Sequence, residues 1–473
     1  MRATERAFQA ERPQPAGGSA RLDLAVIHLT FEGIQTFGGG VATVTRGHLA
    51  AMPKLKEELA KEGISLTPYF AEIAYAKSHE RRDPKFQQYA EEQIAKMGGR
   101  FEYLVNFSQG YLPSAPWGVA DIGDIENWKA CSASGAAVAL NMARRHQVAV
   151  AYCHDSLFAL APMYATLQED ACGVDLTGIY VIHATALTHE LPLPNPQRLM
   201  VESAGIHWAK VTPKVKLGYI SKFMSHHIIE DYGAKQENLV PTGNGINPTD
   251  PFFRLRDRNH IIDKLRQYNI PTDRPLVFSW GRSVAYKKYD IVLKAAAKLK
   301  GKVFPVIMVS PEYPELVELT KQLGLDARLI FAFDPELVAC MLQWENTVAA
   351  ASLAYREPFG LTPTEIRMQG RSRGALVVVS NTGGLVEQVR DGVDGFVTKQ
   401  DDSDDVARVF QHILNMSAAQ KDAIRKAGLQ TVLDHYTWSS QILTTLSAVL
   451  PQITAATNKV RDRLSRETLA ELR

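Results

Sequence analysis

The stretch ALVVVSNTGGLVEQ, residues 375–388, contains the unit from which the whole chain is built. Its run of apolar, mostly β-branched residues predicts a strand that is buried on both faces, as in a parallel sheet. A turn with a glycine pair, Gly383 and Gly384, follows, and we expect a helix to open at Leu385. The free amide groups at the start of such a helix suit a bound diphosphate.

Upstream of this unit, the segment REPFGLTPTE, residues 356–365, carries two carboxylates eight positions apart, Glu357 and Glu365. A Pro-Phe-Gly turn separates them, and we expect a helix after the turn to carry Glu365. Carboxylates accept hydrogen bonds from vicinal hydroxyl groups, and Gly360 allows the backbone to approach a ligand closely. The pair therefore suits the hydroxyl groups of a sugar and a ribose.

The same alternation of short apolar runs and longer amphipathic stretches covers the rest of the chain. The apolar runs are residues 22–31, 148–153, 178–184 and 217–221 in the first half, and 275–280, 303–309, 328–333 and 347–352 in the second. Strands that alternate with helices imply parallel sheets. We predict an α/β chain of two Rossmann-like, doubly wound domains that face a central cleft.

A segment rich in proline, aspartate and arginine, residues 248–272, separates the two series of strands. We therefore expect a first domain over residues 21–248 and a second over 249–450. Residues 1–20 are expected to form a disordered leader. Residues 451–473 predict an amphipathic helix that packs back on the first domain or stays solvated.

The composition excludes several classes of protein. Lysine plus arginine, 53, nearly balance aspartate plus glutamate, 51, so no strong field attracts nucleic acid or an anionic membrane. No apolar run reaches the ~18 residues that span a bilayer. Disulfide or metal-ligand spacing is absent from the cysteines, which predicts reduced thiols and a cytoplasmic location. The cysteines are Cys131, Cys153, Cys172 and Cys340.

Together, EPFGLTPTE at residues 357–365 and SNTGGLVEQVRDGVDGF at residues 380–396 resemble the donor-binding signature of retaining GT-B glycosyltransferases. This clan includes glycogen, starch and sucrose synthases. The segments GRSVAYKKYD, residues 281–290, and NGINP, residues 244–248, extend the resemblance. It implies that the second domain binds a nucleoside-diphosphate sugar and the first an acceptor. The implied donor-binding residues are Gly38, Gly39, Gly40, Arg282, Lys287, Phe359, Gly360, Leu361, Glu365, Thr382, Gly383, Gly384 and Leu385.

In the resembling segment, Arg282 and Lys287 match the pair that holds the donor diphosphate. Negative charge grows on the leaving diphosphate, so two cations beside it stabilise the transition state more than the ground state. With these cations we expect neither a metal nor another cofactor. A surface ion pair is the alternative for Arg282. Lys288 is the alternative phosphate-binding lysine, since it replaces a glycine of the family.

The expected catalytic residues are His183, Arg282, Lys287 and Glu357. Retention of the anomeric configuration follows from the resemblance. We expect the acceptor to attack on the face that the leaving phosphate vacates, while that phosphate takes the proton. Glu357 would orient the transferred sugar and Glu365 the ribose of the nucleotide.

The first domain carries three consecutive glycines, residues 38–40, between a strand and a helix. Their backbone can lie close to a ligand, and a permissive turn without a ligand is the alternative. The resemblance implies that this loop meets the donor phosphates. No lysine precedes these glycines, unlike in glycogen synthase, because Gln35, Thr36 and Phe37 stand there. This difference argues against polymer synthesis.

His183 ends a predicted strand and resembles the family's active-site histidine, with a satisfied core histidine as the alternative. His154 and Asp155 are similar to a His-Asp pair on the acceptor side, although Ser156 replaces the tryptophan that usually follows. The acceptor-side candidates are therefore His154, Asp155, His189 and Glu190, of which the last two fit a surface loop equally well.

We expect a hexosyltransferase-like enzyme that moves a sugar from a nucleoside-diphosphate sugar to a small soluble acceptor, such as a sugar, cyclitol or natural-product intermediate. A glucan or glycogen-type synthase, a sugar phosphorylase and a nucleotide-sugar epimerase are the alternatives among enzymes. A nucleotide-sugar sensor is the alternative outside them. The expected partners are the donor and the acceptor, without nucleic acid or membrane, and a homo-oligomer stays open.

Overall fold

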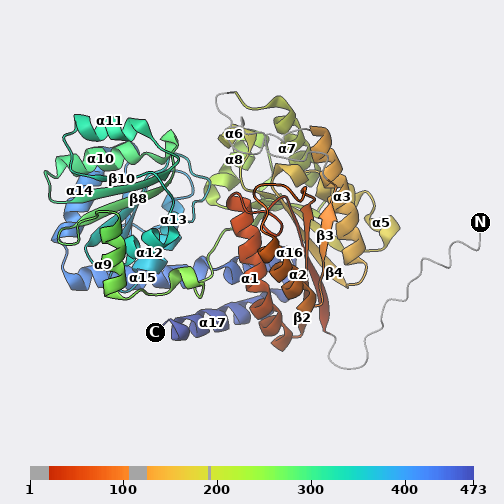
Figure 1. Ribbon diagram of the computed structural model, residues 1–473. Coiled ribbons are helices and arrows are strands. Elements are labelled where there is room, and N and C mark those ends of the chain that lie inside the picture. Colours follow the sequence, from red (N-terminus) through yellow and green to blue (C-terminus); the bar gives the residue numbers. More distant parts are fainter. Residues whose placement is uncertain (1–20, 106–124, 190–192, 473) are drawn as a thin grey trace, which may run out of the picture. The chain divides into compact units, whose positions relative to one another are not determined.

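The computed structural model describes residues 21–105, 125–189 and 193–472. The predicted leader and Glu190 lie outside these residues. The chain divides into two compact units, each with its own sheet (Figure 1). The first unit comprises Met1–Gly218, Tyr232–Val240 and Leu446–Val460, and the second Tyr219–Asp231, Pro241–Thr445 and Arg461–Arg473. The predicted linker over residues 248–272 lies within the second unit, and the domain boundaries that we drew from the sequence stay a proposal.

The first sheet has seven strands in the order β3-β2-β1-β4-β5-β6-β7. The pairs that join β3, β2, β1, β4 and β5 are all parallel. The strands are β1 (Leu22–Thr30), β2 (Ile64–Ile73), β3 (Phe101–Leu104), β4 (Val148–His154), β5 (Leu176–Ile182), β6 (Val215–Tyr219) and β7 (Leu239–Pro241). This order is that of a Rossmann fold, in which the carboxyl ends of the central strands form the ligand-binding edge.

The second sheet has six parallel strands in the order β10-β9-β8-β11-β12-β13. The strands are β8 (Leu276–Arg282), β9 (Phe304–Ser310), β10 (Arg328–Ile330), β11 (Thr347–Ser352), β12 (Leu376–Ser380) and β13 (Phe396–Thr398). Each apolar run that we predicted to be a strand overlaps one, which confirms the expected fold class of two doubly wound parallel sheets.

Helices cover both sheets (Figure 1). Those that precede β8 are α1 (Gly40–Lys61), α2 (Pro84–Lys96), α3 (Ile125–Ala143), α4 (Ala161–Thr166), α5 (Glu169–Cys172), α6 (Ala186–His189), α7 (Pro196–Ala209), α8 (Lys222–Tyr232) and α9 (Arg258–Gln267). Those that follow it are α10 (Tyr289–Lys298), α11 (Pro314–Gln322), α12 (Pro335–Gln343), α13 (Thr362–Gly370), α14 (Ser403–Asn415), α15 (Ala418–His435), α16 (Trp438–Val449) and α17 (Thr454–Glu471). Within the described ranges, every helix is too short or too polar to cross a bilayer.

The core of the second unit shows why the apolar runs are continuous. Val277 of β8 packs with α10 and α14 on one face of the sheet, while Leu276 and Phe278 pack with α9, α12 and α13 on the other. Successive residues of a strand point to opposite faces, so a strand that is covered on both sides must be apolar throughout.

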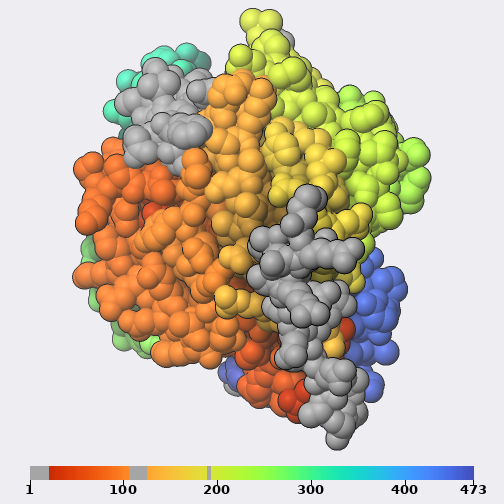
Figure 2. Space-filling model, turned by 90° about the vertical axis from the view of Figure 1, so that its right-hand side faces the viewer, coloured from red at the N-terminus to blue at the C-terminus, as the bar shows by residue number. Residues whose placement is uncertain are grey.

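One edge of the first sheet is formed by β3. Tyr103 on this strand is 53% exposed, and no further strand pairs with β3 in the described part of the chain. Figure 2 shows this side of the first unit, with the orange residues of α2 and β3 at the surface. Near the other end of the chain, Lys459 of α17 forms an ion pair with Glu62 beside the end of α1 at 3.5 Å, and both residues belong to the first unit.

We predict that Asp334→Ala lowers the free energy of unfolding by about 1–3 kcal/mol at neutral pH. The Asp334 carboxylate caps α12 and binds Lys264 at 2.7 Å. Burial acts to raise the pKa of Asp334, but the bonds from Lys264, Tyr268 and the Leu337 amide outweigh it and lower that pKa. A lowered native pKa stabilises the fold above the unfolded value, and this contribution disappears as the pH falls through the native pKa.

Denaturant titrations of the variant and the parent should therefore give free energies that converge below about pH 4. Asp402→Ala is the matched control, because Asp402 also caps a helix through two amides. Asp402 forms no ion pair with any described residue. Its substitution should therefore lower the free energy of unfolding by less than that of Asp334. Equal losses in the two variants at neutral pH would contradict a contribution from Lys264.

Candidate functional site

Three loops of the second unit meet at the carboxyl edge of its sheet. They follow β8, β11 and β12, which are neighbours in the sheet. The amide of Tyr355 donates to the carbonyl of Tyr286 at 2.7 Å and joins the first two loops. The amide of Gly384 donates to the carbonyl of Glu357 at 2.7 Å and joins the second loop to the third. The fold thus brings predicted donor residues from three separate segments to the edge where α/β sheets bind ligands.

An ion pair lies at the centre of these loops. The Lys287 ammonium contacts Oε2 of Glu357 at 2.6 Å, and their side chains are only 19% and 16% exposed. Burial raises the pKa of the nearby Glu365 to about 7, while the charge of Lys287 acts in the opposite direction. The predicted phosphate-binding cation and both predicted hydroxyl-binding acids are therefore neighbours, and α13 carries Glu365 in its first turn as expected.

The two adjacent lysines have different partners. Lys288 has a positive φ of 58°, a left-handed conformation that glycine adopts without strain. Its ammonium binds Asp401 at 2.9 Å, away from the ion pair of Lys287 and Glu357. This arrangement supports Lys287 rather than Lys288 as the phosphate-binding lysine.

Arg282 is the last residue of β8, and its guanidinium is exposed. One nitrogen donates to the hydroxyl of Tyr286 at 2.9 Å, and the carbonyl of Arg282 accepts from the hydroxyl of Tyr289 at 3.1 Å. No carboxylate forms an ion pair with Arg282 among the residues that the structure describes. The alternative of a surface ion pair is therefore not supported, and the guanidinium is available to an anion.

The glycine pair requires a correction. The helix that we expected at Leu385 is a single 3₁₀ turn, η7 (Val386–Gln388). A Cβ on Gly383 would lie 2.4 Å from the carbonyl oxygen of Glu357, and one on Gly384 would lie 2.4 Å from that of Pro358. These glycines are needed because two loops of the chain pack closely. The expected helix is therefore wrong, and the Gly384 amide is not available to an anion because it already donates to Glu357. Binding of the donor diphosphate at this turn stays a prediction.

The other predicted donor residues lie along the same two loops. Gly360 has a positive φ of 72°, Leu361 caps α13, and the hydroxyl of Thr382 accepts from the amide of Arg356 at 3.4 Å. The side chains of Phe359 and Leu385 are buried. Those two residues can therefore reach a donor only through their backbone.

Sequence reasoning missed Gln388, which fastens the two loops. Its buried amide nitrogen donates to the carbonyls of Phe359 at 2.7 Å and Gly360 at 2.9 Å, while its oxygen accepts from Thr364 at 3.1 Å. The adjacent Glu387 accepts from the first amides of α8, those of Lys222 and Phe223. Both residues stand in the recognised motif, but a motif does not show which bonds its members make.

In the first unit, predicted residues gather where β4 and β5 end. His183 follows β5, and its Nε2 lies 3.1 Å from Nδ1 of His154 at the end of β4. His154 is only 1% exposed, which corrects the prediction that it contacts the acceptor. His183 is partly exposed at the edge of the sheet, although burial still lowers its pKa, and the charge of Asp155 opposes that shift. His183 is thus the histidine available to a ligand.

Asp155 has a positive φ of 69°, and its carboxylate accepts from the amide of Ser156 at 2.8 Å. A residue other than glycine in this conformation is strained and is often found at a functional site. His189 ends α6, and Glu190 lies outside the described residues, so the second acceptor-side pair stays a prediction.

The glycine-rich loop of the first unit lies over a carboxylate. Gly39 caps α1, and Oε1 of Glu32 accepts from the amide of Ala42 in its first turn at 3.0 Å. A Cβ on Gly39 would lie 2.8 Å from the same oxygen. Burial raises the pKa of Glu32 to about 7, against the opposing bond from Ala42. A donor phosphate at this loop would therefore compete with an anion of the protein itself.

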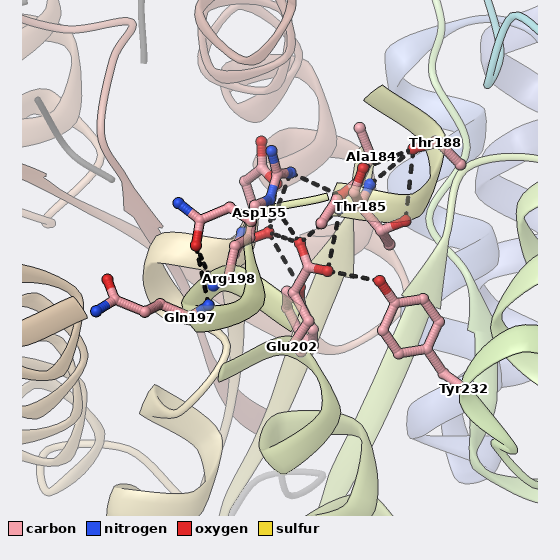
Figure 3. Close-up of polar contacts among 12 residues, drawn as sticks. Asp155, Ala184, Thr185, Thr188, Gln197, Arg198, Glu202 and Tyr232 are labelled. Carbon is pink, nitrogen blue, oxygen red and sulfur yellow. Dashed lines mark hydrogen bonds and ion pairs between the residues drawn. The ribbon is translucent and has the colours of Figure 1, made fainter. Parts of the chain in front are cut away.

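One buried acid holds the two loops that carry His183 and Asp155. Glu202 of α7 accepts from Arg198 at 2.7 Å, from the hydroxyl of Ser156 at 2.6 Å and from the hydroxyl of Tyr232 at 2.6 Å. It also accepts from the amide of Ala186 at 3.1 Å. Figure 3 shows these contacts around Glu202. A single glutamate in a helical stretch gives no sequence signal for such a role.

Two groups of side chains have ligand atoms close enough together for a metal ion. One consists of His28, His48 and His154, and the other of His260, Glu336 and Cys340. In the second group, Glu336 already binds Arg256 at 2.8 Å and His260 at 2.9 Å. Burial raises the pKa of Cys340 to about 12, so its thiol stays protonated. That group is therefore a poor set of metal ligands.

The loops around Lys287 lie in a region that matches a known family. Residues 261–430 match the sequence profile of glycosyl transferases group 1. This part of the chain is therefore similar to glycosyl transferases group 1. The match covers β8 to β13 and includes the ion pair of Lys287 and Glu357, which agrees with the resemblance seen in the sequence.

Curated proteins that are similar to this chain include D-inositol 3-phosphate glycosyltransferases. The protein of Mycolicibacterium paratuberculosis is 33% identical over 185 residues, which are 37% of this chain and 39% of that protein. The protein of Nocardia farcinica is 26% identical over 223 residues, 44% of this chain and 46% of that protein. The chain thus spans less than half the length of the curated relatives that it matches.

Solved structures match nearly the whole chain. Sucrose-phosphate synthase from Thermosynechococcus elongatus has a TM-score of 0.60 at 17% identity and covers 93% of this chain and 99% of its own. Anabaena Alr3699/HepE in complex with UDP-glucose has a TM-score of 0.53 at 15% identity and covers 94% of this chain and 100% of its own. At these identities the likeness shows the fold, which is the predicted GT-B class.

We predict that Glu202→Gln lowers the free energy of unfolding by about 3 kcal/mol or more, because it removes the charge of a fully buried carboxylate that pairs with the Arg198 guanidinium and accepts three further hydrogen bonds. Calorimetric or denaturant unfolding measures this loss. Glu126→Gln is the control, since Glu126 pairs with Lys129 at 2.8 Å on an exposed face of α3. A surface pair contributes about 0–1 kcal/mol, so similar losses in both variants would contradict the role of Glu202.

Proposed function

We propose that this chain is a retaining glycosyltransferase that transfers a sugar from a nucleoside-diphosphate sugar to a small soluble acceptor. The observation that carries the proposal is the ion pair of Lys287 and Glu357, which lies beside Glu365 where three loops of the family-matched region meet. The exposed guanidinium of Arg282 at the end of β8 adds a second cation.

In the ion pair of Lys287 and Glu357, a bound diphosphate can replace Glu357 as the partner of the lysine. A bound diphosphate supplies Lys287 with a new anion and leaves the Glu357 carboxylate free to accept bonds from sugar hydroxyls. The two cations then stabilise the charge that develops on the diphosphate as the anomeric carbon leaves it. In this proposal the acceptor oxygen forms a bond to the anomeric carbon on the face that the phosphate vacates, and its proton passes to a phosphate oxygen.

A uridine nucleotide is the first donor to test, because Alr3699/HepE, a structural neighbour, was solved with UDP-glucose. A cyclitol is the first acceptor to test, because the curated relatives are named D-inositol 3-phosphate glycosyltransferases. Analysis of the products separates the alternatives. A transferase releases nucleoside diphosphate and a glycoside, a phosphorylase releases sugar phosphate, an epimerase needs no acceptor, and a sensor turns nothing over.

We predict that Lys287→Ala weakens the binding of UDP at least tenfold in calorimetry, since a charge-assisted hydrogen bond contributes about 1.5–3 kcal/mol. Transfer from UDP-glucose should fall further, because charge on the diphosphate grows in the transition state. The matched control is Lys288→Ala, because the Lys288 ammonium binds Asp401. The affinity of this variant for UDP should stay within about twofold of that of the parent. Equal losses in the two variants would contradict the assignment of Lys287.

We also predict that Glu365→Ala weakens the binding of UDP-glucose, since its carboxylate accepts from the ribose hydroxyls. Because the pKa of Glu365 is about 7, the ionised and better accepting form is gained as the pH rises through neutrality. The affinity for UDP-glucose should therefore increase between about pH 6 and 8. Glu365→Gln should remove this dependence, and a donor affinity that Glu365→Ala leaves unchanged would rule out the role.

A further inference from the structure

Three imidazole rings of the first unit form a chain from the edge of its sheet into the core. His183 follows β5, His154 ends β4 and His28 lies within β1, and these strands are neighbours. Nε2 of His183 lies 3.1 Å from Nδ1 of His154. Nε2 of His154 lies 3.2 Å from Nδ1 of His28. Each ring is thus joined to the next through one nitrogen.

In both contacts between these rings, the two nitrogens lie on the line that joins the ring centres. The ring centres of His154 and His183 are 5.4 Å apart, 2.3 Å more than their nitrogens (5.4 − 3.1). Those of His28 and His154 are 5.6 Å apart, 2.4 Å more than their nitrogens (5.6 − 3.2). This excess is about two ring radii, and the rings are inclined by only 23° and 13°. The nitrogens therefore face each other along the line of centres, as in an N–H···N hydrogen bond.

His48 lies beside this chain and not within it. Its Nδ1 is 3.5 Å from Nδ1 of His28, but the two rings are inclined by 65°. A metal ion held by His28, His48 and His154 is the competing explanation of the cluster. A zinc ion at about 2.0–2.1 Å from both nitrogens of the 3.2 Å contact would lie to one side of the line that joins them, whereas the two rings direct these nitrogens along that line. The straight geometry favours hydrogen bonds over a metal.

The rings of the chain are neutral, because burial lowers the pKa of His28, His154 and His183. A neutral imidazole has one N–H donor and one acceptor nitrogen. Protons in the chain must therefore all stand on Nδ1 or all on Nε2. In the first arrangement His28 donates to His154 and His154 donates to His183. In the second, the same bonds run in the opposite direction.

Nε2 of His28 distinguishes the two directions. This atom is buried and has no hydrogen-bond partner. The ring lies between the aromatic rings of Phe70 and Tyr152, with centres at 4.6 and 4.9 Å. A buried N–H without an acceptor costs about 1–3 kcal/mol, and orphaned N–H groups are rarer than orphaned acceptors. The proton of His28 therefore belongs on Nδ1.

We propose that the chain fixes His183 as the Nδ1–H tautomer, so that His183 donates a hydrogen bond to an oxygen atom of the bound substrate. His28 and His154 are then positioning residues that act through His183. Nδ1 of His183 has no partner among the described residues, and the side chain is partly exposed. The ligand group that it meets must be an acceptor, such as a hydroxyl, carbonyl or phosphoryl oxygen. This role in substrate binding rests on the proposed function, whereas the tautomer does not.

Nitrogen-15 NMR of the whole chain with labelled histidine tests the proposal, and His183→Asn assigns the signals of His183. We expect the proton of His183 on Nδ1 and an acceptor at Nε2. A proton on Nε2, or exchange between the two tautomers, would overturn the proposal. The measurement needs no substrate, so it stands apart from an assay of transfer from UDP-glucose, whose failure would count against the proposed function alone.

Two variants give a matched pair, since His28 and His48 are neighbours and both are buried. In His28→Phe the donor to His154 is lost, so the tautomer of His183 should become mixed and kcat should fall up to about tenfold. His48→Phe should leave the tautomer unchanged. Loss of the Nδ1–H signal in both variants would contradict the chain. One equivalent of zinc in the purified protein, lost in both variants, would establish the metal site instead.

Discussion

The site of the second unit depends on a close backbone contact between the loops that follow β11 and β12. The amide of Gly384 donates to the carbonyl of Glu357, and neither Gly383 nor Gly384 has room for a side chain. This contact fixes the backbone of Glu357 and so places its carboxylate against Lys287. Gln388 donates two further hydrogen bonds to the loop after β11, to the carbonyls of Phe359 and Gly360. These bonds between the loops hold the Lys287 ammonium beside Glu357 and Glu365.

In the first unit, a buried charged side chain joins two loops that carry candidate functional residues. Glu202 binds the loops after β4 and β5 together, and the bonds from Arg198, Ser156 and Tyr232 compensate for its removal from water. Gln388 in the second unit also joins two loops, through hydrogen bonds of its neutral amide. In both units one buried polar side chain joins two loops at the carboxyl edge of a sheet, and the candidate functional groups lie on those loops.

The sequence revealed the strands whose two faces are both covered, because their apolar runs are continuous. It did not reveal β2, in which Pro68 lies opposite Val26 of β1, since proline argues against an inner strand. In the site it placed Lys287, Glu357 and Glu365 near one another, but the helix that it predicted after the glycine pair is a single 3₁₀ turn. Glycine after a strand gives the same pattern whether the backbone approaches a ligand or another loop. The contact of His154 with His183 depends on strand order, which no local pattern contains.

The carboxylate of Glu32 beneath the glycine-rich loop would couple the predicted binding of a phosphate there to the uptake of a proton. Glu32 holds the amide of Ala42 at the start of α1, and its pKa is about 7. An anion that comes to rest on this loop brings a second negative charge close to the first. Its arrival raises the affinity of Glu32 for a proton, so the ligand and a proton are taken up together. Near neutrality, the phosphate that we predict at this loop would therefore bind together with a proton on Glu32.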